Sequence, residues 1–460
     1  MVTLIGRQAI VVGAGMGGLS AAQALADHFE RVVVLESDVL HDDAGDRAGV
    51  PQGKHVHLLL AGGERALREL FPGFEGDLLK AGAVPMRVGL DLRSETPSLN
   101  PFPQRDLGLV AYAISRPQLE LTVRRRVQAN RTIEIRQRCR VQELVARGAA
   151  VSGVRYEDAG GKTETLDADL VVDASGRGTL TLRLLEAIGR QPPAETSIGV
   201  DLNYATAVFE IPAGAPSDWK GVFTMPGPDG RGGLLLPLEG HRWILTVAGR
   251  HSVKSPGDEA GFMAYVEGFR TKTIFEAIKH AKRLGDIARF GFSVSTRRHY
   301  DGLPEFPAGL VPLGDAVCRF NPIYGQGMSV AAQEAVGLGA LLARRATQSD
   351  PLHGLAADFF AEAVPLIDTP WASAVIPDFI HPETRGERPA NFEQMLKFAL
   401  ALGRLAAKDP DVHRLTAEVQ HLLKPRSVYQ DPALVQRVMA VMSGGVEGNP
   451  ARVPLPKGPK

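Results

Sequence analysis

The chain alternates short apolar runs with segments that have the polar and apolar spacing of helices. The apolar runs have the length of strands, and helical segments follow the first and the last of them. This alternation is typical of a parallel sheet covered by helices. The runs are Gln8–Val12, Arg31–Leu35, Leu170–Val172 and Gly309–Leu313, and the helical segments are Gly18–Ala26 and Gly327–Leu342.

The middle and the end of the chain follow different patterns. Val200–Tyr204, Gly233–Pro237 and Arg242–Val247 have the pattern of antiparallel strands. From residue 328 onward the pattern is mostly helical, with a proline-rich loop expected near Pro377 to Pro389. We therefore expect a second sheet inserted into the α/β unit, and a helical C-terminal region.

The first apolar run ends in a glycine-rich turn that can hold a dinucleotide. Gly13, Gly15 and Gly18 have the G-x-G-x-x-G spacing, between a predicted strand and a predicted helix. Gly13 allows the tight turn, Gly15 lets a pyrophosphate approach the backbone, and Gly18 lets the helix pack closely on the strand. Glu36 ends the second strand 23 residues after Gly13, where a carboxylate can accept the ribose hydroxyls. This unit predicts dinucleotide binding without separating FAD from NAD.

A second glycine-rich segment favours FAD. Gly314 and Asp315 end a predicted strand, and Pro322, Gly325 and Gly327 precede a predicted helix. Asp315 would bond a ribityl hydroxyl. The backbone N–H groups from Gly325 to Met328, at the positive end of the helix, would face the flavin edge where negative charge collects on reduction.

Composition excludes several other classes of protein. The chain has 460 residues, 44% hydrophobic and 23% charged, enough for two domains and a large core. Lys and Arg balance Asp and Glu at 52 each, so no overall field favours nucleic acid. Cys139 and Cys318 give no disulfide framework, and no uncharged run is long enough to span a bilayer. We expect a cytoplasmic protein.

Four segments resemble the FAD-dependent monooxygenases of the para-hydroxybenzoate hydroxylase fold. Within that group the chain is most similar to the flavin epoxidases of polyether antibiotic biosynthesis. The resemblance covers most of residues 6 to 345 and extends more loosely through the C-terminal helices. The segments are PQGKHVHLLLAGG, SRPQLE, DLVVDASGRGT and LGDAVCRFNPIYGQGMSVAA.

The resemblance implies a fold class and a division of the chain. The fold is α/β, with a Rossmann-like FAD-binding domain of the glutathione-reductase type, an inserted antiparallel substrate sheet and a helical C-terminal region. FAD-binding parts are expected at 1–80, 106–196 and 301–345. Substrate-domain segments are expected at 81–105 and 197–300, and the helical region at 346–460.

The resemblance also implies a set of cofactor contacts. Arg116 begins a predicted helix, where its planar guanidinium can hold a diphosphate bidentately. Arg47 lies in a polar loop. Residues carried over as FAD contacts are Gly13, Gly15, Gly18, Glu36, Arg47, Arg116, Asp315 and Gly327. The predicted set adds Met16, Gly17, Ser37, His55, Gly314, Pro322, Gly325 and Met328.

The resemblance further implies a reaction. Reduced FAD would react with O2 to give a C4a-hydroperoxide, which transfers one oxygen atom to a lipophilic small molecule, in secondary metabolism. Electrons would come from NADPH or NADH, or from a partner flavin reductase, since no second nucleotide motif is present. The protein would supply a dry pocket and placement.

Catalytic candidates are few. His55 and His57 are predicted to lie two positions apart in a strand, and we expect no metal site. No convincing general base is found, and none is needed to epoxidise an alkene. Tyr324 lies in the loop expected at the flavin ring and is the first residue to test.

The sequence is compatible with three classes of enzyme. An epoxidase or hydroxylase leads. A reductase or dehydrogenase of the prenyl reductase type needs the same FAD-binding site. The DASG form, which the resemblance gives to prenyl reductases and halogenases alike, is present as Asp173–Gly176, with Ser175 where aromatic hydroxylases carry an aspartate. A flavin halogenase is disfavoured because the GWxWxIP motif is missing and Trp243 stands alone. A carrier or redox sensor would not need so large a sheet-lined cavity.

Overall fold

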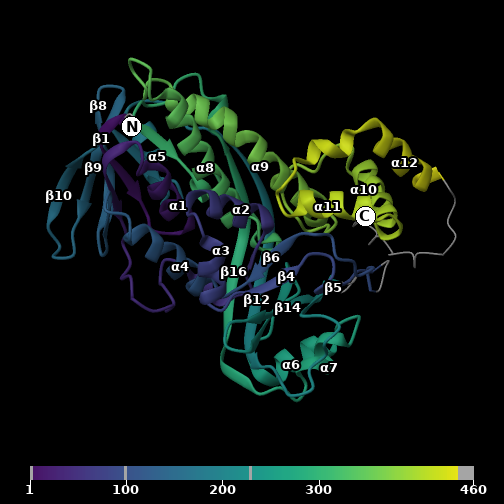
Figure 1. Ribbon diagram of the computed structural model, residues 1–460. Coiled ribbons are helices and arrows are strands. Elements are labelled where there is room, and N and C mark those ends of the chain that lie inside the picture. Colours follow the sequence, from purple (N-terminus) through teal and green to yellow (C-terminus); the bar gives the residue numbers. More distant parts are fainter. Residues whose placement is uncertain (1–3, 98–100, 227–229, 444–460) are drawn as a thin grey trace.

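The computed structural model describes residues 4–97, 101–226 and 230–443, and a five-stranded parallel sheet forms the centre of its first unit (Figure 1). Side chains alternate between the two faces of this sheet. Val11 faces a core shared with helices, whereas Ile10 faces a core shared with a small outer sheet. In spatial order the strands are β17 (Leu310–Pro312), β11 (Leu170–Asp173), β1 (Gly6–Val12), β2 (Phe29–Leu35) and β7 (Ile133–Arg136).

Both faces of the parallel sheet are covered, which explains why its strands are almost continuously apolar. One face packs on α1 (Met16–Leu25), α4 (Arg116–Gln128) and α8 (Gly327–Arg345). The other face packs on α5 (Thr179–Ala187) and a three-stranded antiparallel sheet. That outer sheet consists of β8 (Arg140–Arg147), β9 (Ala150–Glu157) and β10 (Thr163–Asp167).

A seven-stranded sheet makes up the second unit. Its pairs are antiparallel except for β13 with β5, which are parallel. Ala205, Ala207 and Phe209 on one face pack against α6 (Glu259–Glu267) and α7 (Thr273–Ile278). In spatial order the strands are β18 (Cys318–Arg319), β16 (Arg283–His299), β12 (Ala194–Glu210), β15 (Arg242–Arg250), β14 (Gly232–Leu238), β13 (Gly221–Thr224) and β5 (Leu92–Glu95).

A small antiparallel sheet connects the two units. Met86 and Ala113 of this sheet pack on Leu236, Leu238 and Ile244 of the seven-stranded sheet. In spatial order the strands are β3 (Leu58–Leu59), β6 (Val110–Ala113) and β4 (Val84–Arg87). The helices α2 (Ala61–Leu70) and α3 (Phe74–Lys80) lie between β3 and β4 in the chain. The 3-10 turns are η1 (Pro51–Lys54), η2 (Tyr300–Gly302), η3 (Gly314–Ala316), η4 (Pro322–Tyr324) and η5 (Arg426–Gln430).

Four helices form the described C-terminal region; the last three lie to one side in Figure 1, whereas the first packs along α8. The expected proline-rich loop begins later than predicted, because α9 contains Pro365, Pro370 and Pro377 and continues past them. Phe379 at its end is buried against the seven-stranded sheet, and such tertiary packing outweighs the lost backbone hydrogen bonds. The helices are α9 (Leu355–Phe379), α10 (Phe392–Lys408), α11 (Pro410–Gln420) and α12 (Pro432–Ser443).

The predicted α/β class with an inserted sheet and a helical C-terminal region is confirmed. Residues 444–460 of the predicted C-terminal region lie outside the described residues. Within the described ranges, no helix is long and apolar enough to cross a membrane.

Candidate cofactor and substrate site

The two glycine-rich segments meet at one edge of the parallel sheet. In register, Val12 of β1 lies beside Asp173 of β11, and Asp173 lies beside Pro312 of β17. The segments that follow these strands therefore leave the sheet next to one another, although Gly13 and Gly314 are far apart in sequence. Ligands of α/β folds bind at this carboxyl edge.

The first glycine loop has the shape that a pyrophosphate needs. Gly13 has φ +98°, and a Cβ there would lie 2.7 Å from the carbonyl oxygen of Ala174. A Cβ on Gly18 would lie 1.9 Å from the Gly13 carbonyl oxygen, so only glycine allows this packing. A Cβ on Gly15 would meet no protein atom within 4 Å. The loop is thus closed toward the protein at Gly13 and Gly18 and open at Gly15, at the N-terminus of α1.

The other cofactor contacts predicted near this loop, Met16, Gly17 and Ser37, differ in the groups that they offer to a ligand. The Met16 side chain is buried in the core, so its backbone N–H in the first turn of α1 is the group available to a phosphate. Gly17 packs against α8 and β17, where a Cβ would lie 3.1 Å from Leu313. Ser37 donates its hydroxyl to Glu36 Oε1 over 3.2 Å.

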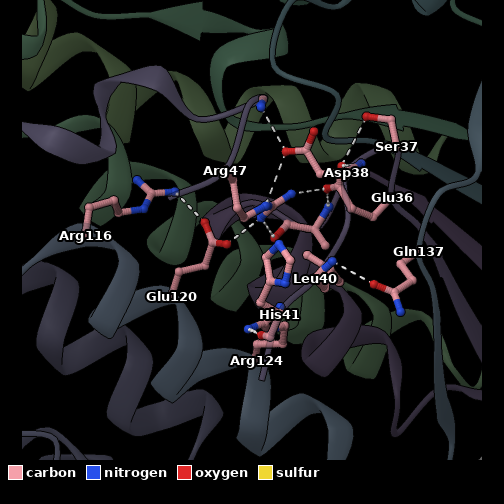
Figure 2. Close-up of polar contacts among 12 residues, drawn as sticks. Glu36, Ser37, Asp38, Leu40, His41, Arg47, Arg116, Glu120, Arg124 and Gln137 are labelled. Carbon is pink, nitrogen blue, oxygen red and sulfur yellow. Dashed lines mark hydrogen bonds and ion pairs between the residues drawn. The ribbon is translucent and has the colours of Figure 1, made fainter. Parts of the chain in front are cut away.

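Glu36 is fixed beside the loop by several donors (Figure 2). Its Oε2 accepts the Ala14 N–H over 2.7 Å, and its Oε1 accepts the Asp38 N–H over 2.8 Å. Arg47 forms an ion pair with Glu36 over 2.6 Å. Burial alone would raise the pKa of Glu36, but Arg47 and the backbone donors outweigh it and lower that pKa. Glu36 is therefore a charged acceptor where the ribose is expected.

Arg47 is the centre of an acidic cluster rather than part of a plain polar loop. It pairs with Asp38 over 3.3 Å, is in close ion contact with Glu120, and donates to the Ala14 carbonyl oxygen over 3.1 Å. Its side chain is almost completely buried. The structure thus gives Arg47 a role in holding Glu36 and the glycine loop, and its predicted direct contact with FAD remains a prediction.

Arg116 begins α4 and belongs to this cluster through Glu120. It is buried and pairs with Glu120 over 3.4 Å, while its Nε has no hydrogen-bond partner. Its charge helps to lower the pKa of His57 and opposes the rise in the pKa of Asp315, so it lies near both groups. A buried cation with an unused donor is well suited to an anionic phosphate.

A buried glutamate of α8 holds the start of the second glycine segment. Glu334 on α8 accepts the Gly314 N–H over 2.7 Å, and Gly314 has φ +67°. Gly325 has φ +65°, and a Cβ there would meet no atom within 4 Å. Gly327 begins α8, so free N–H groups of its first turn, including that of Met328, adjoin this open position.

Asp315, His57 and Tyr324 keep part of their side-chain surface exposed. Each side chain is only half-buried, yet burial shifts each pKa: upward for Asp315 and Tyr324, and to about 3 for His57. Burial disfavours the charged form of each group, so His57 and Tyr324 are neutral. Open glycine positions and an uncommitted arginine donor therefore fit a flavin dinucleotide.

The predicted strand for His55 and His57 is wrong, because both lie between η1 and β3. His55 bonds Thr206 Oγ1 over 2.6 Å, and its ring lies against Tyr204 and Phe290 of the seven-stranded sheet. Burial, with a smaller effect of Lys54, lowers its pKa to about 4, so the ring is neutral. Among the described residues, no group of three or more His, Cys, Asp or Glu side chains could hold a metal ion.

Asp173 and Ser175 form a closed turn at the same edge. Asp173 is buried and accepts the Ser175 hydroxyl over 2.6 Å and the Thr181 hydroxyl over 2.6 Å. In the DASG segment, Asp173 and Ser175 thus stabilise the turn between β11 and α5.

The sequence did not reveal the polar partners of Tyr324. Its hydroxyl donates to Asp378 Oδ1 over 2.7 Å and lies 3.3 Å from Arg250 Nη2. Pro322 opens η4 just before Tyr324, and the Asn321 side chain caps this turn by accepting the Ile323 N–H. Asp378 interrupts an apolar segment of α9, and Arg250 ends the apolar strand β15. A charged residue in an apolar segment is the only sequence feature that could have indicated these buried partners of Tyr324.

Comparisons with known proteins found a matching family and similar proteins. Residues 7–354 match the family described as FAD binding domain. Protein Rv3254 of Mycobacterium tuberculosis (strain ATCC 25618 / H37Rv) is 35% identical over 348 residues, 73% of this chain and 73% of that protein. Kynurenine 3-monooxygenase of Stenotrophomonas maltophilia (strain K279a) is 26% identical over 389 residues, 79% of this chain and 77% of that protein.

Solved structures share the fold. The flavin-dependent brominase Bmp2 aligns with a TM-score of 0.67 and 15% identity, covering 94% of this chain and 98% of that chain. The p-nitrophenol 4-monooxygenase PnpA from Pseudomonas putida DLL-E4 aligns with a TM-score of 0.64 and 18% identity, covering 92% and 100%. At these identities the likeness establishes the architecture alone.

Proposed function

The chain belongs to the family of FAD-binding-domain monooxygenases, and from that premise we propose that it inserts one oxygen atom of O2 into a lipophilic small molecule by hydroxylation or epoxidation. The observation that carries the proposal is the meeting of the two glycine segments at the carboxyl edge of the parallel sheet, with open positions at Gly15 and Gly325. Closeness to polyether epoxidases, and a place in secondary metabolism, remain part of this proposal.

We assign the residues that would hold FAD as follows. The backbone at Gly15 and the first turn of α1 would take the pyrophosphate, and Glu36 the ribose. Asp315 would bond the ribityl chain, and the N-terminus of α8 from Gly325 onward would face the ring. When bound and reduced, FAD supplies the electrons that activate O2.

The protein's own contribution is placement and exclusion of water. Tyr204 and Phe290 of the seven-stranded sheet, with His55, offer an apolar aromatic wall. These residues would orient a lipophilic substrate, because an aromatic wall binds flat apolar molecules and admits little water. NADPH or NADH, or a partner flavin reductase, is the proposed electron donor, and the cytoplasm is the proposed location.

Oxygen labelling tests the proposal. FAD-loaded protein is supplied with NADPH, 18O2 and a panel of lipophilic arenes and alkenes, and we expect one 18O atom in a product. Gly15→Val is the matched control that should form none. A product that gains hydrogen without oxygen, formed equally well under argon, would contradict the monooxygenase.

A reductase of the prenyl reductase type is the second candidate. The Asp173–Gly176 turn, with Ser175 in the position of an aspartate, is compatible with it, because the resemblance gives that form to prenyl reductases and to halogenases. Turnover under argon distinguishes the two. The halogenase alternative stays disfavoured, because the GWxWxIP motif is missing.

A further inference from the structure

A buried carboxylate of the C-terminal region reaches the loop expected at the flavin. Asp378 of α9 has no exposed surface, and its Oδ1 accepts hydrogen bonds from three groups. The donors are Arg250 Nη1 at 2.7 Å, Asn321 Nδ2 at 2.9 Å and the Tyr324 hydroxyl at 2.7 Å. Asp378 thus joins α9, the end of β15 and the η4 turn.

The cluster is balanced in charge. Arg250 is buried, and Asp378 is its ion-pair partner. The nearby His381 is neutral, because burial and the charge of Arg250 lower its pKa to about 4. Tyr204, whose hydroxyl has no hydrogen-bond partner, is also neutral, since burial raises its pKa well above the ordinary value. The group as a whole presents no net charge.

The hydrogen bonds also fix the orientation of Tyr324. Its single hydroxyl proton is committed to Asp378, and Arg250 occupies one lone pair of the oxygen. Tyr324 is half-buried and adjoins Gly325, where a Cβ would find open space. The cluster therefore borders the space that we assign to the flavin ring and the substrate.

We propose that Asp378 is a positioning and specificity-determining residue. By cancelling the charge of Arg250 and anchoring Tyr324, it makes the substrate space select uncharged molecules and exclude carboxylates. This inference rests on the proposed function. It places a determinant of specificity on α9, beyond residues 7–354 that match the family.

Three ligands of equal size and different charge test it. Benzoate, benzamide and benzamidine are titrated into the FAD-loaded protein, and binding is followed by the change in the visible flavin spectrum. Wild type should bind benzamide at least about tenfold more tightly than either ion, since an uncompensated charge in a buried site is costly. Asp378→Asn should then favour benzoate by about tenfold, because Arg250 is left unpaired.

Arg250→Met is the complementary variant. It leaves Asp378 unpaired, so benzamidine should gain about tenfold while benzoate does not. The double variant Asp378→Asn, Arg250→Met should return the preference to benzamide. A purely structural role for Asp378 would weaken all three ligands together and would not invert their order.

Several outcomes would overturn the inference. Benzoate binding to wild type as tightly as benzamide would do so, as would an unchanged ligand order in both single variants with FAD retained. Absence of any spectral change with all three ligands would show that the cluster does not face the ligand space. If one single variant binds no FAD, the inference is tested by the ligand affinities of the other single variant and of wild type. Failure of wild type to bind FAD would instead contradict the proposed function.

Discussion

Glu334 on α8 accepts the backbone N–H of Gly314 over 2.7 Å, and so connects the helix to the turn that carries Asp315. Burial raises the pKa of Glu334 to about 7, partly offset by this N–H and reinforced by Asp315. The folded protein therefore favours the protonated acid. The stability associated with protonation is complete below pH 4.5, and is lost as the pH rises through 7.

The first prediction concerns the Glu334→Gln variant. Glutamine keeps an acceptor for Gly314 without ionising, so the variant should be more stable than wild type at pH 8.5, by at most about 3 kcal/mol. At pH 4.5 the two should be nearly equal. Urea unfolding of FAD-saturated protein at both pH values measures this difference, with exposed Glu69→Gln of α2 as control. Equal stability at pH 8.5 would mean that Glu334 is ionised in the fold.

A pair of glycine variants separates folding from cofactor binding. Gly15→Val places its side chain where no protein atom lies within 4 Å, so the apoprotein should keep its melting temperature. FAD affinity should fall on the order of 100-fold, because the side chain occupies the phosphate position. Gly18→Ala should lose both properties, since its Cβ would lie 1.9 Å from the Gly13 carbonyl oxygen. Flavin absorbance per protein and thermal unfolding are the two measurements. Full FAD retention by Gly15→Val would remove the site assignment.

Arg47 should stabilise the protein even without FAD. Arg47→Met leaves Glu36, Asp38 and Glu120 without their shared cation, and removing one partner of a buried pair costs about 3 kcal/mol. Denaturant unfolding of the apoprotein measures this loss. Arg31→Met, which breaks an exposed ion pair with Glu134, is the control and should change stability by less than about 1 kcal/mol. If Arg47 acts only by touching FAD, the apoprotein will be unaffected.

Local patterns predicted the parts of the site that depend on consecutive residues. The turns at Gly13 and Gly314 were predictable because a strand, a glycine and a helix follow one another in sequence. The Arg47 cluster was not, because Glu120 comes from a helix 73 residues away. Asp378 likewise meets Arg250 across 128 residues, and only the packing of α9 on the seven-stranded sheet brings them together. His55 was assigned to a strand because its alternating neighbours resemble one, although its ring is held by Thr206 of the other sheet.

Tyr324 gives the last prediction, since its hydroxyl is the polar group of the flavin loop that borders the proposed substrate space. Tyr324→Phe removes that hydroxyl and leaves the Arg250–Asp378 pair in place, so FAD should stay bound and stability should fall by only about 1 kcal/mol. Turnover of an accepted substrate should fall by about tenfold or more, because the Tyr324 ring loses the bonds to Asp378 and Arg250 that fix it beside the substrate space. Tyr300→Phe is a matched control: its hydroxyl is also buried, has no hydrogen-bond partner, and belongs to a ring stacked on Phe360. Steady-state rates, compared at equal flavin content, should separate the two variants. Equal rates in both would show that the Tyr324 hydroxyl only completes the packing around Asp378.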